Sequence, residues 1–435
     1  MLPRLLLADE VGRIFDHPAL AAVVAIGERW EPVGELSPLP EGANLQALPG
    51  WAPVGYDEQD GRFVVVDVLE IGGKRIRPRA VGAVLPPGWT RSALPAGKRS
   101  LLAPSLPQWA YTAAALGPAG LAVAALRTER RGHWNPARFS LPQLPASVAA
   151  RRAAAPQNRV LQQLETCALR YRCFTAQNVF YDRDEAALPT STSCNARCIG
   201  CISEQPKGAP PSSHVRMAEA PLWQDLAEVG GRHLAMAKGH VMVSFGQGCE
   251  GEPLTRDHAI AQAIRAMRKH TQRGSIHLNT NASLTDAFDR LVRAGLDSVR
   301  VSLNSAHDEL YEAYYLPQGY TFPDVERTIR LARRRKLYVA LNLLTFPGVT
   351  DREGEVEALS SLIVRHRIDQ LQTRPLAIDP RSYVEVADGR GAGGEPLGLR
   401  EMLRRLRKAA PWLVVGNFSR AKGERSGLHS QSRRP

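Results

Sequence analysis

The segment Cys194-Asn-Ala-Arg-Cys198-Ile-Gly-Cys201 places three cysteines within eight residues, separated by three residues and then by two. Three thiolates at this spacing can hold one compact metal centre. They fall one short of the four ligands that close a structural zinc site or a fully protein-ligated iron–sulfur cluster. The spacing therefore predicts a metal centre that keeps one position open for another ligand.

A second motif follows the cysteine segment. Residues 240–245 have the apolar character of a buried strand and lead into Gly246-Gln-Gly-Cys-Glu-Gly251-Glu252-Pro253, a glycine-rich turn with an acidic residue near its end. After Cys201, strand and helix patterns alternate as in parallel βα units. In this order and setting, the two motifs resemble those of the radical S-adenosylmethionine (radical SAM) superfamily, over about residues 186–385.

The resemblance implies a set of cofactor contacts. In this superfamily three cysteines hold three irons of a [4Fe–4S] cluster, and SAM binds the fourth iron. The matching residues in this chain are Cys194, Cys198 and Cys201. Glu252 would face the ammonium of SAM, with Gly251 allowing a close backbone approach and Pro253 completing the motif.

One position departs from the superfamily pattern. The residue before the third cysteine is commonly aromatic there and packs near the adenine, whereas here it is Gly200. Contacts to the adenine must then come from the backbone, from Ile199 or Ile202, or from a later strand.

The later strands carry polar side chains on one face. Successive side chains of a strand point to opposite faces, so residues 276–281 and 299–304 each separate into an apolar and a polar face. A sealed parallel barrel would have both faces apolar, and polar inner faces therefore predict a cavity for a polar ligand. The residues expected to contact SAM or substrate are Asn279, Asn281, Ser302, Asn304 and Arg374. The amides and the hydroxyl would hydrogen-bond ribose or carboxylate groups, and the arginine would pair with a carboxylate.

The predicted fold is α/β, a partial (β/α)6 radical SAM barrel with a small β-rich N-terminal domain. Residues 1–155 carry many prolines and short β-like runs separated by Gly and Pro turns, which is typical of a small β domain. The expected parts are a β-rich accessory domain of unknown role (1–155), a helical connector (156–185), the barrel (186–385) and a C-terminal helix, strand and basic tail (386–435).

Three further cysteines, Cys167, Cys173 and Cys249, lie outside the cysteine segment. One interpretation is a second iron–sulfur site, and another makes Cys249 a donor of a hydrogen atom or an electron. The alternative is that they are buried and inert, as cysteines in protein cores commonly are. We expect the inert state.

Histidines and tyrosines near the predicted cavity are the remaining candidates. His240 and His307 are expected to be hydrogen-bonded structural residues, whereas His277 shares a strand face with Asn279 and stays a candidate for proton transfer. The tyrosines are expected to pack in the core, with a lid over the cavity as the alternative. They are Tyr311, Tyr314, Tyr315 and Tyr320.

The formal net charge of +13 is concentrated towards the C-terminal end, where residues 400–435 hold ten Lys or Arg and two Glu. A further basic cluster occupies residues 333–336. Such charge is either a footprint for RNA or another polyanion, or a solvated helix face and tail. No aromatic-rich basic patch accompanies it, which favours the solvated surface.

Composition limits the class of protein further. A length of 435 residues and a hydrophobic content of 44% allow two globular domains. Six dispersed cysteines, three in a metal-ligand spacing, argue for a reducing cytosol and against a secreted disulfide scaffold. The first ten residues have too short an apolar run for a secretory signal, and Pro118 and Gly120 interrupt the uncharged run 109–126. We expect a cytoplasmic protein without a membrane span.

The sequence as a whole predicts a radical SAM enzyme with a [4Fe–4S] cluster and SAM as cofactors. Its substrate would be a small molecule, a peptide or an RNA, and a flavodoxin or ferredoxin would supply electrons. The competing hypothesis is a non-catalytic zinc or iron–sulfur protein associated with RNA, which explains the cysteines and the charge but not the Gly251-Glu252-Pro253 motif.

Overall fold

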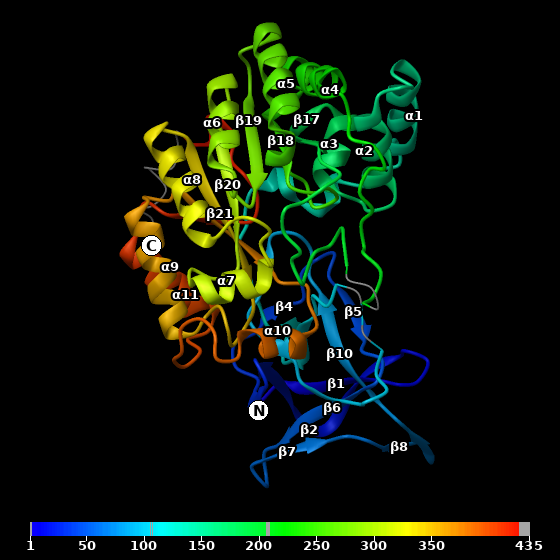
Figure 1. Cartoon of the computed structure of the whole chain (residues 1–435). Helices are drawn as coiled ribbons and strands as arrows, with labels where there is room; N and C mark the ends of the chain where they lie inside the picture. The colour runs from blue at the N-terminus through cyan, green and yellow to red at the C-terminus, as the bar shows by residue number, and fades with distance from the viewer. Residues whose placement is uncertain (1, 105, 107, 206–208, 426–435) are drawn as a thin grey trace. The chain divides into compact units, whose positions relative to one another are not determined.

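The computed structural model describes residues 2–104, 106, 108–205 and 209–425 (Figure 1). The chain divides into two compact units, and neither is one continuous segment. The first unit comprises Met1–Arg130, Thr345–Glu357 and Arg374–Arg405; the second comprises Arg131–Leu344, Ala358–Thr373 and Leu406–Pro435. The four domain boundaries expected from the sequence remain predictions.

The first unit is β-rich, as predicted, and is built around a twelve-stranded sheet with antiparallel pairings. Its core includes Leu5, Leu7, Leu20 and Val66. Glycine allows the tight two-residue turn between the second and third strands, since Gly27 has a φ of +60°. The strands are β1 (Arg4–Ala8), β2 (Ile14–Ile26), β3 (Arg29–Pro32), β4 (Ser37–Pro38), β5 (Asn44–Ala47), β6 (Trp51–Asp57), β7 (Arg62–Val65), β8 (Leu69–Ile71), β9 (Lys74–Ile76), β10 (Arg79–Val84), β11 (Trp89–Arg91), β12 (Leu94–Pro95), β13 (Gly97–Arg99), β14 (Thr112–Gly117), β15 (Gly120–Val123) and β16 (Ala125–Arg127).

The second unit begins with short helical elements and continues into a seven-stranded sheet whose strands follow chain order. The opening elements are η1 (Gly132–Trp134), η2 (Pro136–Arg138), α1 (Leu144–Ala154), α2 (Arg159–Leu169) and α3 (Phe174–Tyr181). The strands are β17 (Arg183–Leu188), β18 (Lys238–Phe245), β19 (Ser275–Thr280), β20 (Ser298–Leu303), β21 (Tyr338–Thr345), β22 (Gln370–Pro375) and β23 (Val414–Gly416). The pairs from β17 to β21 and the pair β22–β23 run parallel.

Helices alternate with these strands, which confirms the predicted partial radical SAM barrel. Figure 1 shows β17 to β21 side by side. The intervening and following helices are α4 (Trp223–Met236), η3 (Pro253–Arg256), α5 (Asp257–His270), α6 (Thr285–Ala294), α7 (Asp308–Tyr315), α8 (Phe322–Arg334), α9 (Glu353–Arg365), α10 (Pro380–Ala387), α11 (Leu399–Ala409) and α12 (Lys422–Arg425). The sequence predicts a strand near β23 but not its membership of this sheet, because pairing partners are not visible in a local pattern.

The amino ends of the barrel strands are covered by residues 418–425, called here the C-terminal segment. The carbonyl of Phe418 accepts from Gln370 Nε2 at 2.9 Å, and Ser419 Oγ lies 2.9 Å from His277 Nε2. The backbone N–H of Lys422 donates to Ser275 Oγ at 2.8 Å. The polar inner face was predicted to line a ligand cavity, but at this end another part of the same chain satisfies it.

The expectation that the tail is solvated surface was therefore wrong for most of residues 419–425, of which Lys422 and Gly423 are exposed. Ser419 is buried, and the carboxylate of Glu424, 6% exposed, pairs with Arg131 at 2.7 Å. The guanidinium of Arg425 lies 4.4 Å from the ring centroid of Tyr338. Residues 426–435 of the predicted tail lie outside the described part of the chain.

The second basic cluster, at residues 333–336, is partly paired. Arg333 Nη1 donates to Asp369 at 2.6 Å, and Arg335 Nη2 donates to Asp289 at 2.8 Å. Such pairs lower the positive charge available to a polyanion. None of the helices among the described residues is long and apolar enough to cross a membrane.

Candidate active site

The cysteine segment follows β17 and is fixed by backbone contacts to α7. The N–H of Arg197 donates to the carbonyl of Tyr315 at 3.0 Å, and the N–H of Ile199 donates to Tyr314 at 3.1 Å. All three thiols are free and their residues half-buried. The backbone of the cysteine segment is thus held by α7, while its three cysteines remain partly accessible to solvent.

The thiols lie in an environment that disfavours negative charge. Burial raises the pKa of Cys194 to about 11, and the charge of Glu252 acts in the same direction. Burial, together with the neighbouring Cys201 and Cys194, also raises the pKa of Cys198. Arg216 Nη2 lies 3.9 Å from the sulfur of Cys201. Three ionised thiolates here would need a cation among them, and bound metal ions meet that need.

The second motif is joined to the cysteine segment through the backbone. Gly251 N–H donates to the carbonyl of Ser191 and Glu252 N–H to that of Ser193, both at 2.9 Å. A Cβ atom on Gly251 would lie 1.9 Å from the oxygen of Ser193, so no other residue fits. The backbone that Gly251 approaches closely is thus that of Ser193, the residue before Cys194.

Glu252 is buried, with 4% of its surface exposed, and its carboxylate is hydrogen-bonded on both oxygens. Oε1 accepts from Leu254 N–H at 3.0 Å and from Thr280 Oγ1, and Oε2 accepts from Asn281 N–H at 2.8 Å. Burial raises the pKa of Glu252 to about 7, although these hydrogen bonds act against the shift. Above that pH the carboxylate offers negative charge beside the cysteines, in a site with low solvent access.

Glu250 is a structural support that the sequence did not reveal. Its buried Oε2 accepts from the N–H groups of Thr190 at 2.6 Å and Ser191 at 2.7 Å, and Oε1 accepts from Gln247 N–H at 2.7 Å. Burial raises the pKa of this carboxyl to about 7. Glu250 therefore ties the turn of the second motif to the residues before the cysteine segment. The only signal in the sequence was an acidic residue two positions before Glu252.

Substituting Glu250→Gln should destabilise this junction. At pH 8 the carboxylate accepts three N–H groups, whereas an amide would turn its own N–H₂ towards at least one of them. We expect the free energy of unfolding to fall by about 1–3 kcal/mol, the usual cost of leaving a buried donor without an acceptor. Thermal unfolding measures this. The exposed Glu309→Gln is the matched control, and equal Tm values for the two variants would refute the support role.

Among the polar residues predicted to bind SAM or substrate, Asn281 reaches the cysteine segment. Its Nδ2 donates to Asn195 Oδ1 at 2.9 Å, and Asn195 Nδ2 donates to Ser283 Oγ at 2.9 Å. Asn195, between the first and second cysteines, was not singled out from the sequence. The pair fixes the end of β19 to the cysteine segment.

The other predicted polar residues make contacts elsewhere. The amide of Asn279 donates to the carbonyl of Phe245 at 2.8 Å, and that of Asn304 to the carbonyl of Leu310 at 3.1 Å. Ser302 is half-buried in β20. Arg374 is half-buried in β22 and belongs to the first compact unit. Their roles in binding stay predictions.

The predicted core tyrosines are buried, as expected, and those of α7 border the cysteine segment. The hydroxyls of Tyr311 and Tyr320 lie 3.5 Å apart. Burial raises the pKa of Tyr320, and the nearby Cys198 adds to the shift. Ile202, the residue after Cys201, lies against the backbone of Gly248, where an added Cβ would meet its Cδ1 at 2.6 Å. Apolar and aromatic groups thus border the thiols.

The three remaining cysteines are free, and two of them touch. A hydrogen bond that the Cys249 thiol donates to Cys167, together with burial, raises the pKa of Cys249, and both residues are buried. Cys173 is half-buried, with its sulfur 3.2 Å from Thr175 Oγ1. Burial of Cys167 and Cys249 agrees with the inert interpretation, and the second iron–sulfur site remains the alternative.

The histidines near the barrel strands differ in their surroundings. His277 is buried, and its ring nitrogens contact Ser298 Oγ at 2.8 Å, Asn279 Oδ1 at 3.1 Å and Ser419 Oγ at 2.9 Å, as in a structural residue; a role in proton transfer stays a prediction. His240 was expected to be hydrogen-bonded, but its ring is 46% exposed and lies beside His133.

Comparison with known proteins identifies the family. Residues 188–359 match the family model described as the Radical SAM superfamily. The match begins at the last residue of β17 and covers both the cysteine segment and the second motif. Residues 188–359 are thus similar to the radical SAM domain of a superfamily of enzymes, as the two motifs predicted. No curated protein matches the chain.

Solved structures with partial similarity include Streptococcus suis SuiB bound to S-adenosylmethionine (15% identity, TM-score 0.37) and a radical SAM methyltransferase from Sphaerobacter thermophilus (18% identity, TM-score 0.38). The similarity covers 52% of this chain and 46% of SuiB, and 53% of this chain and 64% of the methyltransferase. This chain therefore spans less than two thirds of either structure. At these identities and TM-scores, the similarities add no argument about its reaction.

Proposed function

We propose that this protein is a radical SAM enzyme in which Cys194, Cys198 and Cys201 hold a [4Fe–4S] cluster and the motif around Glu252 binds SAM. One observation carries the proposal. Within the family-matched segment, the backbone of residues 251–252 pairs with Ser191 and Ser193, immediately before the first cysteine. This pairing supports one site formed by both motifs, because it brings the buried carboxylate of Glu252 close enough to act electrostatically on the Cys194 thiol.

The three thiols fit a cluster with one iron left for SAM. They influence one another electrostatically, and burial disfavours an isolated thiolate, so that iron ions would stabilise the ionised form. One-electron reduction of SAM, with release of methionine and a 5′-deoxyadenosyl radical that abstracts hydrogen from the substrate, is the chemistry that this cluster supplies in the superfamily.

The protein's own residues would bind and orient SAM and exclude water from the site. Glu252 accepts a hydrogen bond from the ammonium of SAM. Thr280 and the backbone N–H of Asn281 hold the Glu252 carboxylate in place. Tyr311 and Tyr320 form a buried wall near the thiols, which lowers the access of water to a reactive species. Positioning of this kind needs no catalytic acid or base.

The test is anaerobic reconstitution with iron and sulfide, followed by reduction in the presence of SAM. We expect about four irons per chain, as in a single [4Fe–4S] cluster, and formation of 5′-deoxyadenosine. Tightly bound zinc without SAM cleavage would contradict the proposal and support the non-catalytic RNA-associated protein. The substrate, a small molecule, peptide or RNA, and a flavodoxin or ferredoxin as electron donor remain part of the proposal, as does a cytoplasmic location.

Glu252→Gln should weaken SAM binding while leaving the iron content unchanged. The substitution removes the negative charge that faces the ammonium, and a charge-assisted hydrogen bond contributes about 1.5–3 kcal/mol. The Kd for SAM, measured by calorimetry at pH 8, should rise about ten- to a hundredfold. Glu309→Gln controls for the loss of one acidic residue elsewhere. Unchanged affinity in the Glu252 variant would show that the motif does not hold the ammonium.

A further inference from the structure

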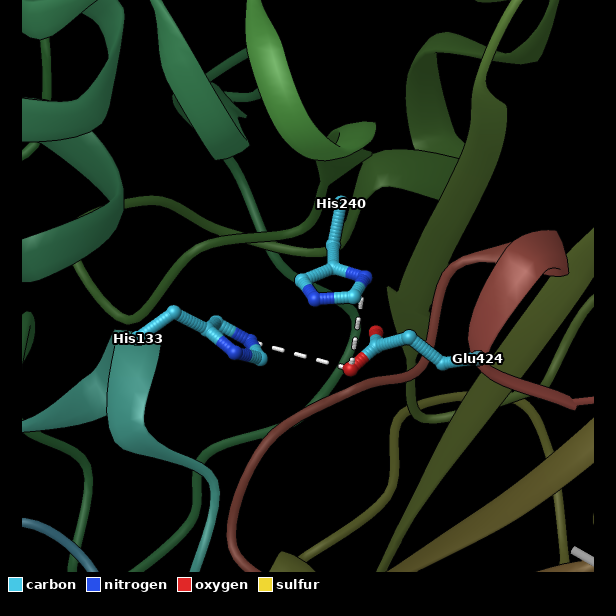
Figure 2. Close-up of side chains that lie close together, drawn as sticks. All are labelled: His133, His240 and Glu424. Atoms are coloured by element: carbon cyan, nitrogen blue, oxygen red, sulfur yellow. Dashed lines mark ion pairs between the residues drawn. The ribbon is translucent and has the colours of Figure 1, made fainter. Parts of the chain in front are cut away.

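Two histidines and a glutamate from distant parts of the chain converge at the amino end of β18 (Figure 2). His133 belongs to η1, His240 is the third residue of β18, and Glu424 belongs to α12. One ligand atom of each lies within 4.8 Å of the others. No part of the proposed SAM chemistry uses these residues.

The distances between the three groups leave room for an atom at their centre. Glu424 Oε1 lies 3.7 Å from His133 Nε2 and 3.9 Å from His240 Nδ1, beyond hydrogen-bond distance. The two imidazole rings lie 4.5 Å apart between centroids. Ligands about 2.1 Å from a tetrahedral zinc ion are about 3.4 Å from one another. Small side-chain rotations would bring all three atoms to that separation.

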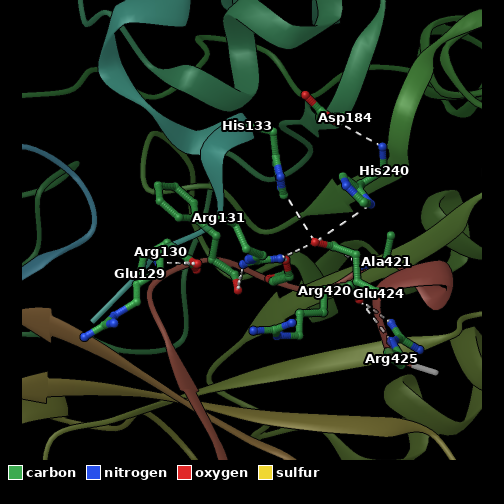
Figure 3. Close-up of polar contacts among 12 residues, drawn as sticks. Glu129, Arg130, Arg131, His133, Asp184, His240, Arg420, Ala421, Glu424 and Arg425 are labelled. Carbon is green, nitrogen blue, oxygen red and sulfur yellow. Dashed lines mark hydrogen bonds and ion pairs between the residues drawn. The ribbon is translucent and has the colours of Figure 1, made fainter. Parts of the chain in front are cut away.

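A second carboxylate, that of Asp184, lies next to the three groups (Figure 3). Asp184 is buried; its Oδ1 accepts from the N–H of His240 at 3.1 Å, and its Oδ2 has no hydrogen-bond partner among the described residues, with Arg138 Nη2 3.9 Å away as an ion pair. Its charge acts on His133. A neutral imidazole offers a ring nitrogen to a metal ion, and His133 Nε2 is the nitrogen that lies nearest Glu424 here.

Arg131 opposes a cation most directly, since its Nη1 donates to Glu424 Oε1 at 2.7 Å, and Arg138 and Arg425 add positive charge near Asp184 and Glu424. Each carboxylate oxygen has two lone-pair sites, so Oε1 can accept from Arg131 and still bind a metal ion. Oε2 accepts from the N–H of Ala421 at 3.0 Å. Hydrogen bonds of this kind commonly orient carboxylates that bind metals.

We propose that His133, His240 and Glu424 form a structural site for one zinc ion. Two imidazoles and one carboxylate suit zinc, whereas magnesium and calcium prefer oxygen ligands alone. Water completes the tetrahedron on the exposed side of His240. The site is separate from the cysteine segment, because the five residue steps of β18 from His240 to Phe245 span about 16 Å. The ion would fasten the C-terminal segment and η1 to β18, whether or not the protein cleaves SAM.

The test uses the full chain with Cys194, Cys198 and Cys201 replaced by alanine, so that the cysteine segment cannot bind zinc. After treatment with a chelator, this protein should bind about one zinc ion per chain, with an increase in Tm. Adding His240→Ala should raise the zinc Kd more than about a hundredfold, since even residues that only orient ligands contribute ten- to a hundredfold. Cobalt in the site should show visible absorption without thiolate charge-transfer bands.

The matched control is His258→Ala, an exposed histidine on α5. It should leave the zinc affinity unchanged. His240 is itself half exposed, so its loss should not unfold the protein, and Glu424→Gln gives a second variant with the same expected loss of zinc. Absence of zinc binding in the parent, equal zinc affinity in the two histidine variants, or tighter binding of Fe²⁺ than of Zn²⁺ would each overturn the proposal.

Discussion

Cys198→Ala protein, reconstituted anaerobically, should hold no [4Fe–4S] cluster and form no 5′-deoxyadenosine above background. Cys198 is the central residue of the segment, and its thiol is influenced by both neighbours, Cys194 and Cys201. Two remaining thiolates cannot retain a cluster that three hold in the parent. Iron should therefore fall from about four per chain to near zero.

Cys173→Ala is the control for this loss, because Cys173 lies outside the cysteine segment and contacts Thr175. It should keep the full cluster and full SAM cleavage. If Cys198→Ala retained a cluster and cleaved SAM, the assignment of the cysteine segment would be wrong. If Cys173→Ala lost several irons while SAM cleavage persisted, the second iron–sulfur site would replace the inert interpretation.

The two motifs were predictable because the chemistry of each is local in the chain. Residue type and spacing are enough to show the resemblance that singles out the cysteines and Glu252. Glu250 and Asn195 were missed because their roles depend on partners far away in sequence. Glu250 binds the N–H of Thr190 60 residues earlier, and Asn195 binds Asn281 86 residues later. No local pattern reports such contacts.

The polar strand faces show a different limit. Alternation correctly separated polar from apolar residues, and the inference to a ligand cavity assumed that only a ligand could satisfy the polar face. At the amino ends of the strands, Ser419 and the carbonyl of Phe418 satisfy His277 and Gln370 instead. A polar inner face therefore shows that a polar partner exists, but not whether that partner is a ligand or the chain itself.

Charge composition misled in the same way. It counts charged side chains without their partners, and Arg131 and Glu424 are 293 residues apart in sequence. Their ion pair is mostly shielded from solvent, with side-chain exposures of 14% and 6%. Lys422 is likewise paired with Asp297. Charged side chains of the C-terminal segment thus form ion pairs with other parts of the second unit.

Deleting residues 419–435 should consequently destabilise the second unit severely. The deletion removes the acceptor of Gln372 Nε2 and the carboxylate that pairs with Arg131, and it takes one of three contacts from His277. A buried polar group without a partner costs about 1–3 kcal/mol, more if it is charged, and a typical domain has only about 5–15 kcal/mol of stability in total. We expect a large fall in Tm or loss of soluble protein, measured by thermal unfolding and by the soluble yield.

Deleting only residues 426–435 is the matched control, because it leaves every described contact of the C-terminal segment in place. This shorter deletion should keep the Tm of the full chain. The comparison separates packing from charge: Arg433 and Arg434 are lost in both variants, whereas Glu424 and Ser419 are lost only in the longer deletion. If both deletions left the Tm unchanged, residues 419–425 would be the solvated surface that their composition suggested, and the contacts with His277 and Arg131 would contribute nothing to stability.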